Sequence, residues 1–190
     1  MQDDLFFDLS QSLPDRFRYK ADAISQATQD ELLTWIPTLP FKAFDFHGYQ
    51  GKRGVVSFGW KYDFTLATLQ KADDIPDILF PLRDIPANFA GMAPGRFQQV
   101  LVSEYDIGAP IGWHRDKAVF GVVVGISLLS PCTFRLRCRN GEKWERASIE
   151  AEPGSSYVLS GPARTEWEQS IPPVDRLRYS ITFRELSNVV

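Results

Sequence analysis

From Phe97 onward, the sequence is a succession of short β-strand patterns separated by turns that contain glycine and proline. Apolar residues in these segments are often β-branched or aromatic, which is typical of strands. Short strands joined by such turns predict a jelly roll, a two-sheet sandwich whose open end can hold a metal ion. The predicted strands cover residues 99–105, 119–129, 134–139, 144–150, 156–159, 165–169 and 177–186.

The N-terminal half gives more mixed signals. The sequence Thr28-Gln29-Asp30-Glu31 has the form of a capping box and predicts a helix with Thr28 as its N-cap. Residues 41–64 predict strands and a hairpin. Residues 75–92 are apolar at helical spacing, but Pro81 and Pro86 predict that this helix is broken.

Length and composition favour one globular domain with a hydrophobic core, because the chain has 190 residues and 44% of them are hydrophobic. The net charge of -3 gives no global attraction to nucleic acid, so such binding needs a local basic patch.

Cys132 and Cys138 could pair, although reduced thiols are expected in a cytosolic protein. No apolar run approaches the ~18 residues of a membrane span. The acidic start Met1-Gln2-Asp3-Asp4 lacks the basic region of a signal peptide. We therefore expect a cytoplasmic protein without membrane contact, and we favour a monomer.

A candidate metal-binding pair lies in Trp113-His114-Arg115-Asp116. Residues two apart in a strand point to the same side, so the His114 imidazole and the Asp116 carboxylate can converge on one ion. Imidazole and carboxylate are two of the three groups of a non-haem Fe(II) oxygenase site. The alternative is an ordinary polar pair at the end of a strand.

Four segments together resemble the AlkB family of Fe(II)/2-oxoglutarate-dependent dioxygenases, bacterial type. They are residues 104–116, 126–129, 161–173 and 178–184, the last of which is Arg178-Tyr179-Ser180-Ile181-Thr182-Phe183-Arg184. The resemblance extends over about residues 41–186.

The resemblance implies a mainly β fold with flanking helices. Its core would be a double-stranded β-helix, a jelly-roll variant, at about residues 96–187. An N-terminal extension and nucleotide-recognition lid would occupy about residues 1–95, so that residues 1–190 form a single domain. The implied cofactors are Fe(II), the co-substrate 2-oxoglutarate and O₂.

Several residues match the family's site positions. His114 and Asp116 match two of the iron ligands. Arg178 matches the arginine that binds the distal carboxylate of 2-oxoglutarate, a role that suits the planar guanidinium. Arg184 matches a second arginine near the metal, and Tyr105 matches a phenol that hydrogen-bonds the co-substrate. The alternative for the two arginines is an outward-facing pair in a salt bridge.

The sequence departs from the family at the third iron ligand, where Gln169 replaces the distal histidine. An amide oxygen is a weaker donor to divalent iron than a neutral imidazole. The only other histidine, His47, lies in the lid region, where a local hydrogen-bonding role is expected. Ser103 and Ser180 replace asparagines near the co-substrate, and Ala118 replaces an acidic residue that reads the base in some members.

Two groups of residues are candidates for substrate contact. Trp60 and Tyr62 share one strand face, where they can stack on a base taken out of the duplex, whereas Phe58 and Phe64 are expected in the core.

The second group is the row Arg135, Arg137 and Arg139. These alternate with apolar residues before the hairpin signal Asn140-Gly141, so they share a face that could contact phosphates. The alternative is an edge strand protected from aggregation by charge.

The resemblance implies oxidative dealkylation of alkylated DNA or RNA bases. Two alternatives remain open. One is a catalytically impaired or silent member that binds nucleic acid, which Gln169 favours. The other is a dioxygenase acting on a protein or small molecule, which Ala118 and the negative charge favour.

Overall fold

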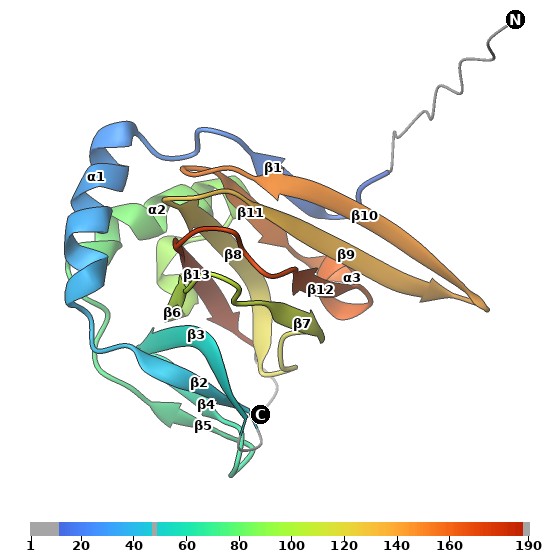
Figure 1. The fold of residues 1–190 in the computed structure, drawn as a ribbon, viewed down its shortest axis with the longest axis horizontal. Coiled ribbons are helices and arrows are strands. Elements are labelled where there is room, and N and C mark those ends of the chain that lie inside the picture. Colours follow the sequence, from blue (N-terminus) through green and yellow to red (C-terminus); the bar gives the residue numbers. More distant parts are fainter. Residues whose placement is uncertain (1–11, 47–48, 188–190) are drawn as a thin grey trace, which may run out of the picture.

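Two antiparallel β-sheets face each other and helices cover one of them, as the ribbon in Figure 1 shows. The computed structural model describes residues 12–46 and 49–187. The larger sheet has the strand order β1-β11-β8-β13-β6-β3-β2, and the smaller has the order β10-β9-β12-β7. A separate two-stranded ribbon, β4-β5, lies beside β2 and β3 in Figure 1. The mainly β jelly-roll fold is therefore confirmed.

The strands are β1 (Phe17–Lys20), β2 (Lys42–Phe46), β3 (Tyr49–Phe58), β4 (Trp60–Asp63), β5 (Thr68–Lys71), β6 (Phe97–Tyr105), β7 (Ile111–His114), β8 (Phe120–Leu128), β9 (Cys132–Asn140), β10 (Lys143–Ala151), β11 (Ser156–Leu159), β12 (Glu168–Ile171) and β13 (Arg178–Leu186). The helices are α1 (Gln26–Trp35), α2 (Leu79–Ala90) and α3 (Gly161–Thr165), with short 3₁₀ helices η1 (Ile36–Thr38) and η2 (Pro94–Arg96). None of the helices in the described residues is long and apolar enough to span a membrane. His47 lies outside those residues.

Two helix predictions are wrong. The N-cap of α1 is Ser25 rather than Thr28: the Ser25 hydroxyl accepts the Thr28 backbone N–H at 3.1 Å. Both residue types can cap a helix, and the earlier start adds a turn ahead of the buried Leu32. Helix α2 is continuous although Pro86 lies inside it. Burial of Leu79 and Leu82 against the sheet offsets the lost hydrogen bond, and Pro81 lies in the first turn, where no intrahelical N–H bond is needed.

The predicted strand at residues 165–169 is also partly wrong. Residues up to Thr165 form α3, and β12 begins only at Glu168. Pro162 occupies the first turn of α3, a position that proline favours.

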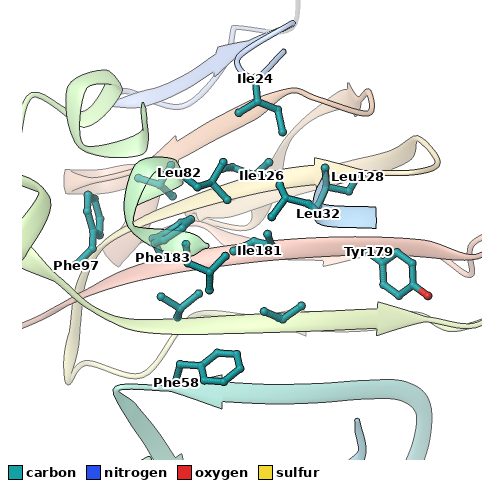
Figure 2. Close-up of a cluster of buried hydrophobic side chains, with 14 of the residues drawn as sticks. Ile24, Leu32, Phe58, Leu82, Phe97, Ile126, Leu128, Tyr179, Ile181 and Phe183 are labelled. Carbon is teal, nitrogen blue, oxygen red and sulfur yellow. The ribbon is translucent and has the colours of Figure 1, made fainter. Parts of the chain in front are cut away.

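The hydrophobic core has two parts. One part lies between the helices and the outer face of the larger sheet, and Figure 2 shows its central side chains, including Leu32, Leu82 and Ile126. The other part lies between the two sheets and includes Phe134, Leu136 and Cys132. Cys132 and Cys138 are both free thiols, as predicted.

Strand β13 separates the core from the functional site. It lies between β6 and β8 in the larger sheet. Tyr179, Ile181 and Phe183 point to the helices and belong to the outer part of the core (Figure 2). Because side chains alternate along a strand, Arg178 and Arg184 point to the opposite face, toward the smaller sheet. The period-two pattern thus places charged residues on the inside of the sandwich.

Candidate functional site

A cleft of about 1190 Å³ opens at the mouth of the sandwich. Its walls come from the inner faces of both sheets and from β3, β4 and β5. His114, Asp116 and Gln169 line it, together with Arg184 and Tyr105. Residues from β6, β7, β12 and β13 therefore meet in one enclosure.

The structure brings His114, Asp116 and Gln169 together. Gln169 on β12 is paired in register with His114 on β7. The Gln169 side-chain nitrogen Nε2 lies 2.8 Å from Asp116 Oδ2 and 3.4 Å from His114 Nε2. Gln169 thus lies at the third corner of the predicted metal site.

The protonation of His114 suits a metal ligand. Its Nδ1 lies 2.9 Å from the Gly112 carbonyl oxygen, which can only accept, so Nδ1 carries the proton and Nε2 keeps a free lone pair. Burial lowers the pKa of His114, against the opposing effects of Asp116 and the Gly112 carbonyl. The imidazole is therefore neutral at pH 7.

Asp116 is held as a carboxylate. Burial acts to raise its pKa, but Arg184, His114 and Arg164 together lower it below the usual value. Arg184 donates to Asp116 Oδ1 from Nε at 3.0 Å and forms a salt bridge to it from Nη2 at 2.8 Å. Arg184 Nη1 also donates to Gln99 Oε1 at 3.1 Å. Asp116 Oδ1 is thus occupied by Arg184, and Oδ2 faces His114 and Gln169.

Arg178 forms a second polar site deeper in the sandwich. Only 1% of its surface is exposed. Its Nη2 donates to Ser127 Oγ at 3.2 Å, and its guanidinium lies 4.7 Å from the centre of the Tyr105 ring. Within the described residues, its Nε and Nη1 have no hydrogen-bond partner. A buried guanidinium with unpaired donors fits an anionic group such as a carboxylate.

Tyr105 and three serines complete this second site. The hydroxyl groups of Tyr105 and Ser180 lie 3.3 Å apart. Ser103, Ser180 and Ser127 stand side by side on β6, β13 and β8, and all three are buried. Sequence reasoning missed Ser127, since only the register between β8 and β13 shows that it lies beside Arg178.

The residues present fit 2-oxoglutarate well and a metal ion in part. Arg178 supplies the cationic site for a carboxylate, and His114 Nε2 and Asp116 Oδ2 are two metal donors. Among the described residues, no group of three or more histidine, cysteine, aspartate and glutamate side chains could hold a metal. The third donor would have to come from the amide of Gln169.

Of the predicted stacking residues, only Tyr62 lines the cleft, and it does so with Phe64. The two rings meet edge to face with centres 5.1 Å apart, and Lys117 Nζ lies 5.5 and 5.4 Å from them. Trp60 is not part of the lining, and Lys71 lies over its ring.

The prediction of Phe64 as a core residue is wrong. Strand β4 ends at Asp63, and Phe64 lies two positions after Tyr62, so the alternation of side chains places both rings on the same side.

The predicted arginine row exists, but all three of its members already have hydrogen-bond partners, and that of Arg139 is the Gly141 carbonyl at 3.0 Å. Arg135 donates to Ser170 Oγ at 3.1 Å, and Arg137 forms a salt bridge with Glu168 at 2.6 Å. The Arg137 guanidinium also lies 4.3 Å from the ring centres of both Trp113 and Trp144. Arg139 is exposed and lies near Trp144.

The cleft is strongly basic although the chain carries a net negative charge. Eight lysine and arginine side chains line it against two aspartates, Asp73 and Asp116. The basic residues are Lys42, Lys52, Arg53, Lys61, Lys71, Arg115, Lys117 and Arg184. This concentration of charge is not visible in the sequence, because the residues are scattered over more than 140 positions.

Arg164 is a further residue that sequence reasoning missed. It is 8% exposed and donates to the backbone carbonyls of Lys117, Phe120 and Gly121 at 2.6, 2.7 and 3.1 Å. These carbonyls belong to the segment that follows Asp116. Arg164 therefore fixes the loop between β7 and β8 beside the candidate metal site.

The fold is similar to that of the solved structure titled "The structure of OsALKBH1". The TM-score is 0.69 at 16% sequence identity, over 92% of this chain and 99% of that chain. No curated protein matches the sequence. The 2OG-Fe(II) oxygenase superfamily matches residues 41–184, which include His114, Asp116, Gln169 and both site arginines. Members of this superfamily use Fe(II), 2-oxoglutarate and O₂. The chain thus belongs to the 2OG-Fe(II) oxygenase superfamily and is a 2-oxoglutarate-dependent dioxygenase.

Proposed function

We propose that this dioxygenase is of the AlkB type and removes alkyl groups from the bases of DNA or RNA. The observation that carries the proposal is the charge of the cleft, where eight basic side chains face two acidic ones. Clefts lined by one sign of charge concentrate ligands of the opposite sign. A polymer of phosphates fits such a cleft better than a neutral metabolite does.

In this proposal, the inner end of the cleft binds the cofactors. Arg178 binds the distal carboxylate of 2-oxoglutarate through its guanidinium, which has unpaired donors, and Tyr105, Ser103 and Ser180 lie beside it. His114 and Asp116 bind Fe(II), and Arg184 fixes the Asp116 carboxylate through Oδ1. With 2-oxoglutarate and O₂, the bound iron would supply the oxidising power for hydroxylation of an N-alkyl carbon.

The outer end of the cleft would bind the base. Tyr62 and Phe64 offer aromatic surface there, and stacking contributes about 1–3 kcal/mol per base. Enzymes that act on bases take them out of a duplex or use single strands. We propose that the β4-β5 ribbon, with Trp60 on it, forms part of the nucleotide-recognition lid within residues 1–95.

The exposed end of the arginine row would extend the phosphate-binding surface beyond the cleft. Arg139 is its exposed member, whereas Arg135 and Arg137 are engaged with Ser170 and Glu168. The row begins beside Trp113, which also lines the cleft. A cytoplasmic location and a monomeric state remain predictions from the sequence.

A second candidate function is nucleic-acid binding without oxidation. The orientation of Gln169 favours it, since the amide N–H groups of Gln169 face both metal-binding atoms. Such a protein would keep the basic cleft and lose the reaction.

The test uses short single-stranded DNA and RNA carrying one N-methylated base, incubated with the protein, Fe(II) and 2-oxoglutarate. Mass spectrometry of the base and assay of succinate are the readouts, with unmethylated strands and Arg178→Ala as controls. Loss of the methyl group with matching succinate is expected. Salt-sensitive binding without turnover would support the second candidate instead. Neither binding nor turnover would overturn the nucleic-acid proposal and point to a protein or small-molecule substrate.

A further inference from the structure

The orientation of the Gln169 amide follows from the two groups that it faces. Asp116 Oδ2 is a carboxylate oxygen, and His114 Nε2 has a lone pair because Nδ1 is bound to the Gly112 carbonyl. Both groups accept hydrogen bonds, so the amide must turn its NH₂ group toward them. The two N–H groups of Gln169 Nε2 therefore point to Asp116 Oδ2 and His114 Nε2, the same two atoms that would bind a metal ion.

The other end of the same amide has no partner. Gln169 is 9% exposed, and its Oε1 is buried without a hydrogen-bond donor among the described residues. A buried acceptor without a partner costs free energy, and such atoms in native proteins call for an explanation. A cation at the position of the NH₂ group would explain it, because a half turn of the amide would bring Oε1 to that position.

We propose that Gln169 is the third metal ligand of this site and binds through Oε1 after its amide turns over. The torsion involved is one between sp³ and sp² carbons, which has a broad and nearly two-fold profile, so the turn needs no backbone movement. Arg184 keeps Asp116 in place through Oδ1 while Oδ2 changes its partner from an N–H group to the metal.

This inference predicts an altered metal preference. The ligands would be one imidazole nitrogen, one carboxylate oxygen and one amide oxygen. Oxygen ligands suit Mn(II), whereas imidazole suits Zn(II) and other later metals. Compared with a site of two imidazoles and one carboxylate, the native site should therefore discriminate less strongly against Mn(II). The inference rests on the proposed metal site, but it does not depend on the nucleic-acid substrate.

The experiment is a titration of chelator-treated full-length protein with Mn(II) and with Zn(II). The native chain is compared with Gln169→Leu, which removes the amide, and with Gln169→His. Gln169→Leu should weaken both metals at least about tenfold, the lower end of the range for changes around a metal ligand. Gln169→His should tighten Zn(II) at least about tenfold more than Mn(II). Gln70→Leu on β5 is the matched control, and it should leave both affinities unchanged.

Two results would overturn the proposal. Equal or tighter binding in Gln169→Leu would show that the amide only blocks the site. Equal tightening of Mn(II) and Zn(II) by Gln169→His would show that Oε1 is not a ligand in the native chain. If Gln169→Leu does not fold, Gln169→Asn removes the reach of the amide but keeps its chemistry, and the same loss is expected.

Nuclear magnetic resonance gives a second readout that needs no activity. The side-chain NH₂ signals of Gln169 can be assigned by their absence in the Leu variant. On addition of diamagnetic Zn(II), these signals should shift, because the NH₂ group leaves Asp116. Unchanged signals at saturating metal would contradict the turn. Because no nucleic acid is present, these results are independent of the dealkylation test.

Discussion

Arg178 and Arg184 lie on the same face of β13, yet their surroundings give them different roles. Arg184 has a carboxylate partner in Asp116 and an amide partner in Gln99. Arg178 is more deeply buried, its Nη2 donates to the neutral Ser127, and its Nε and Nη1 have no partner among the described residues. Burial opposes its charge, but Tyr105, Cys132 and Tyr157 raise the pKa of Arg178 above its usual value. A permanent buried cation with free donors is therefore prepared for an anionic ligand.

The prediction at this position concerns 2-oxoglutarate. Arg178→Ala should weaken its binding by about 2–5 kcal/mol, the usual loss when one partner of a buried charge pair is removed. Arg178→Lys should recover only part of the affinity, because an ammonium cannot offer two parallel donors. Calorimetry with an inert divalent metal measures both. Unchanged affinity in Arg178→Ala would refute the assignment, and urea unfolding of each variant controls for loss of the fold.

At the scale of elements, strands were easier to predict than the turns and helices around them. The alternation in β13 predicted that Arg178 and Arg184 share a face, and the structure confirms it. The continuous helix α2 was not predictable from propensity, because tertiary burial of Leu79 and Leu82 outweighs the effect of Pro86. Register between distant strands is likewise absent from local patterns, so the contribution of Ser127 could not be predicted.

In the candidate site too, some positions could be predicted from local sequence patterns and others could not. The spacing of His114 and Asp116 predicted a shared side, and the structure brings them together with Gln169. The same two-residue spacing relates Phe64 to Tyr62, so its position in the cleft lining was also predictable from alternation. Arg164 acts through backbone carbonyls more than 40 residues away, which no motif reveals.

The aromatic residues of the β4-β5 ribbon differ in their position relative to the cleft, and this gives a testable prediction. Tyr62→Ala and Phe64→Ala should each weaken binding of a methylated single strand by about 1–3 kcal/mol through lost stacking. Trp60→Ala, on the same ribbon but outside the cleft lining, should have a smaller effect. Fluorescence anisotropy with a labelled oligonucleotide measures the three affinities. A loss at Trp60 as large as that at Tyr62 would mean that the base also contacts the part of the ribbon outside the cleft.

For the whole molecule, the distribution of charge matters more than its sum. The chain has 24 acidic and 21 basic residues, which alone would disfavour a polyanionic ligand. The fold nevertheless gathers basic side chains from β2, β3, β4, β5, β13 and the loop after β7 around one cleft. The negative charge must therefore lie mainly outside the cleft, and binding should depend on a few identifiable cations.

The last prediction separates those cations by the salt dependence of binding. On a single strand, each phosphate contact contributes about -0.7 to the slope of log K against log salt. Lys52 and Lys61 are exposed and line the cleft, so Lys52→Ala combined with Lys61→Ala should flatten the slope by about 1.4 units. Arg137→Ala combined with Arg139→Ala should flatten it by only about 0.7, because Arg137 is paired with Glu168. Lys20→Ala, on an exposed position of β1 away from the cleft, should leave the slope unchanged. If the arginine pair had the larger effect, the polymer would follow the β9-β10 hairpin rather than the cleft.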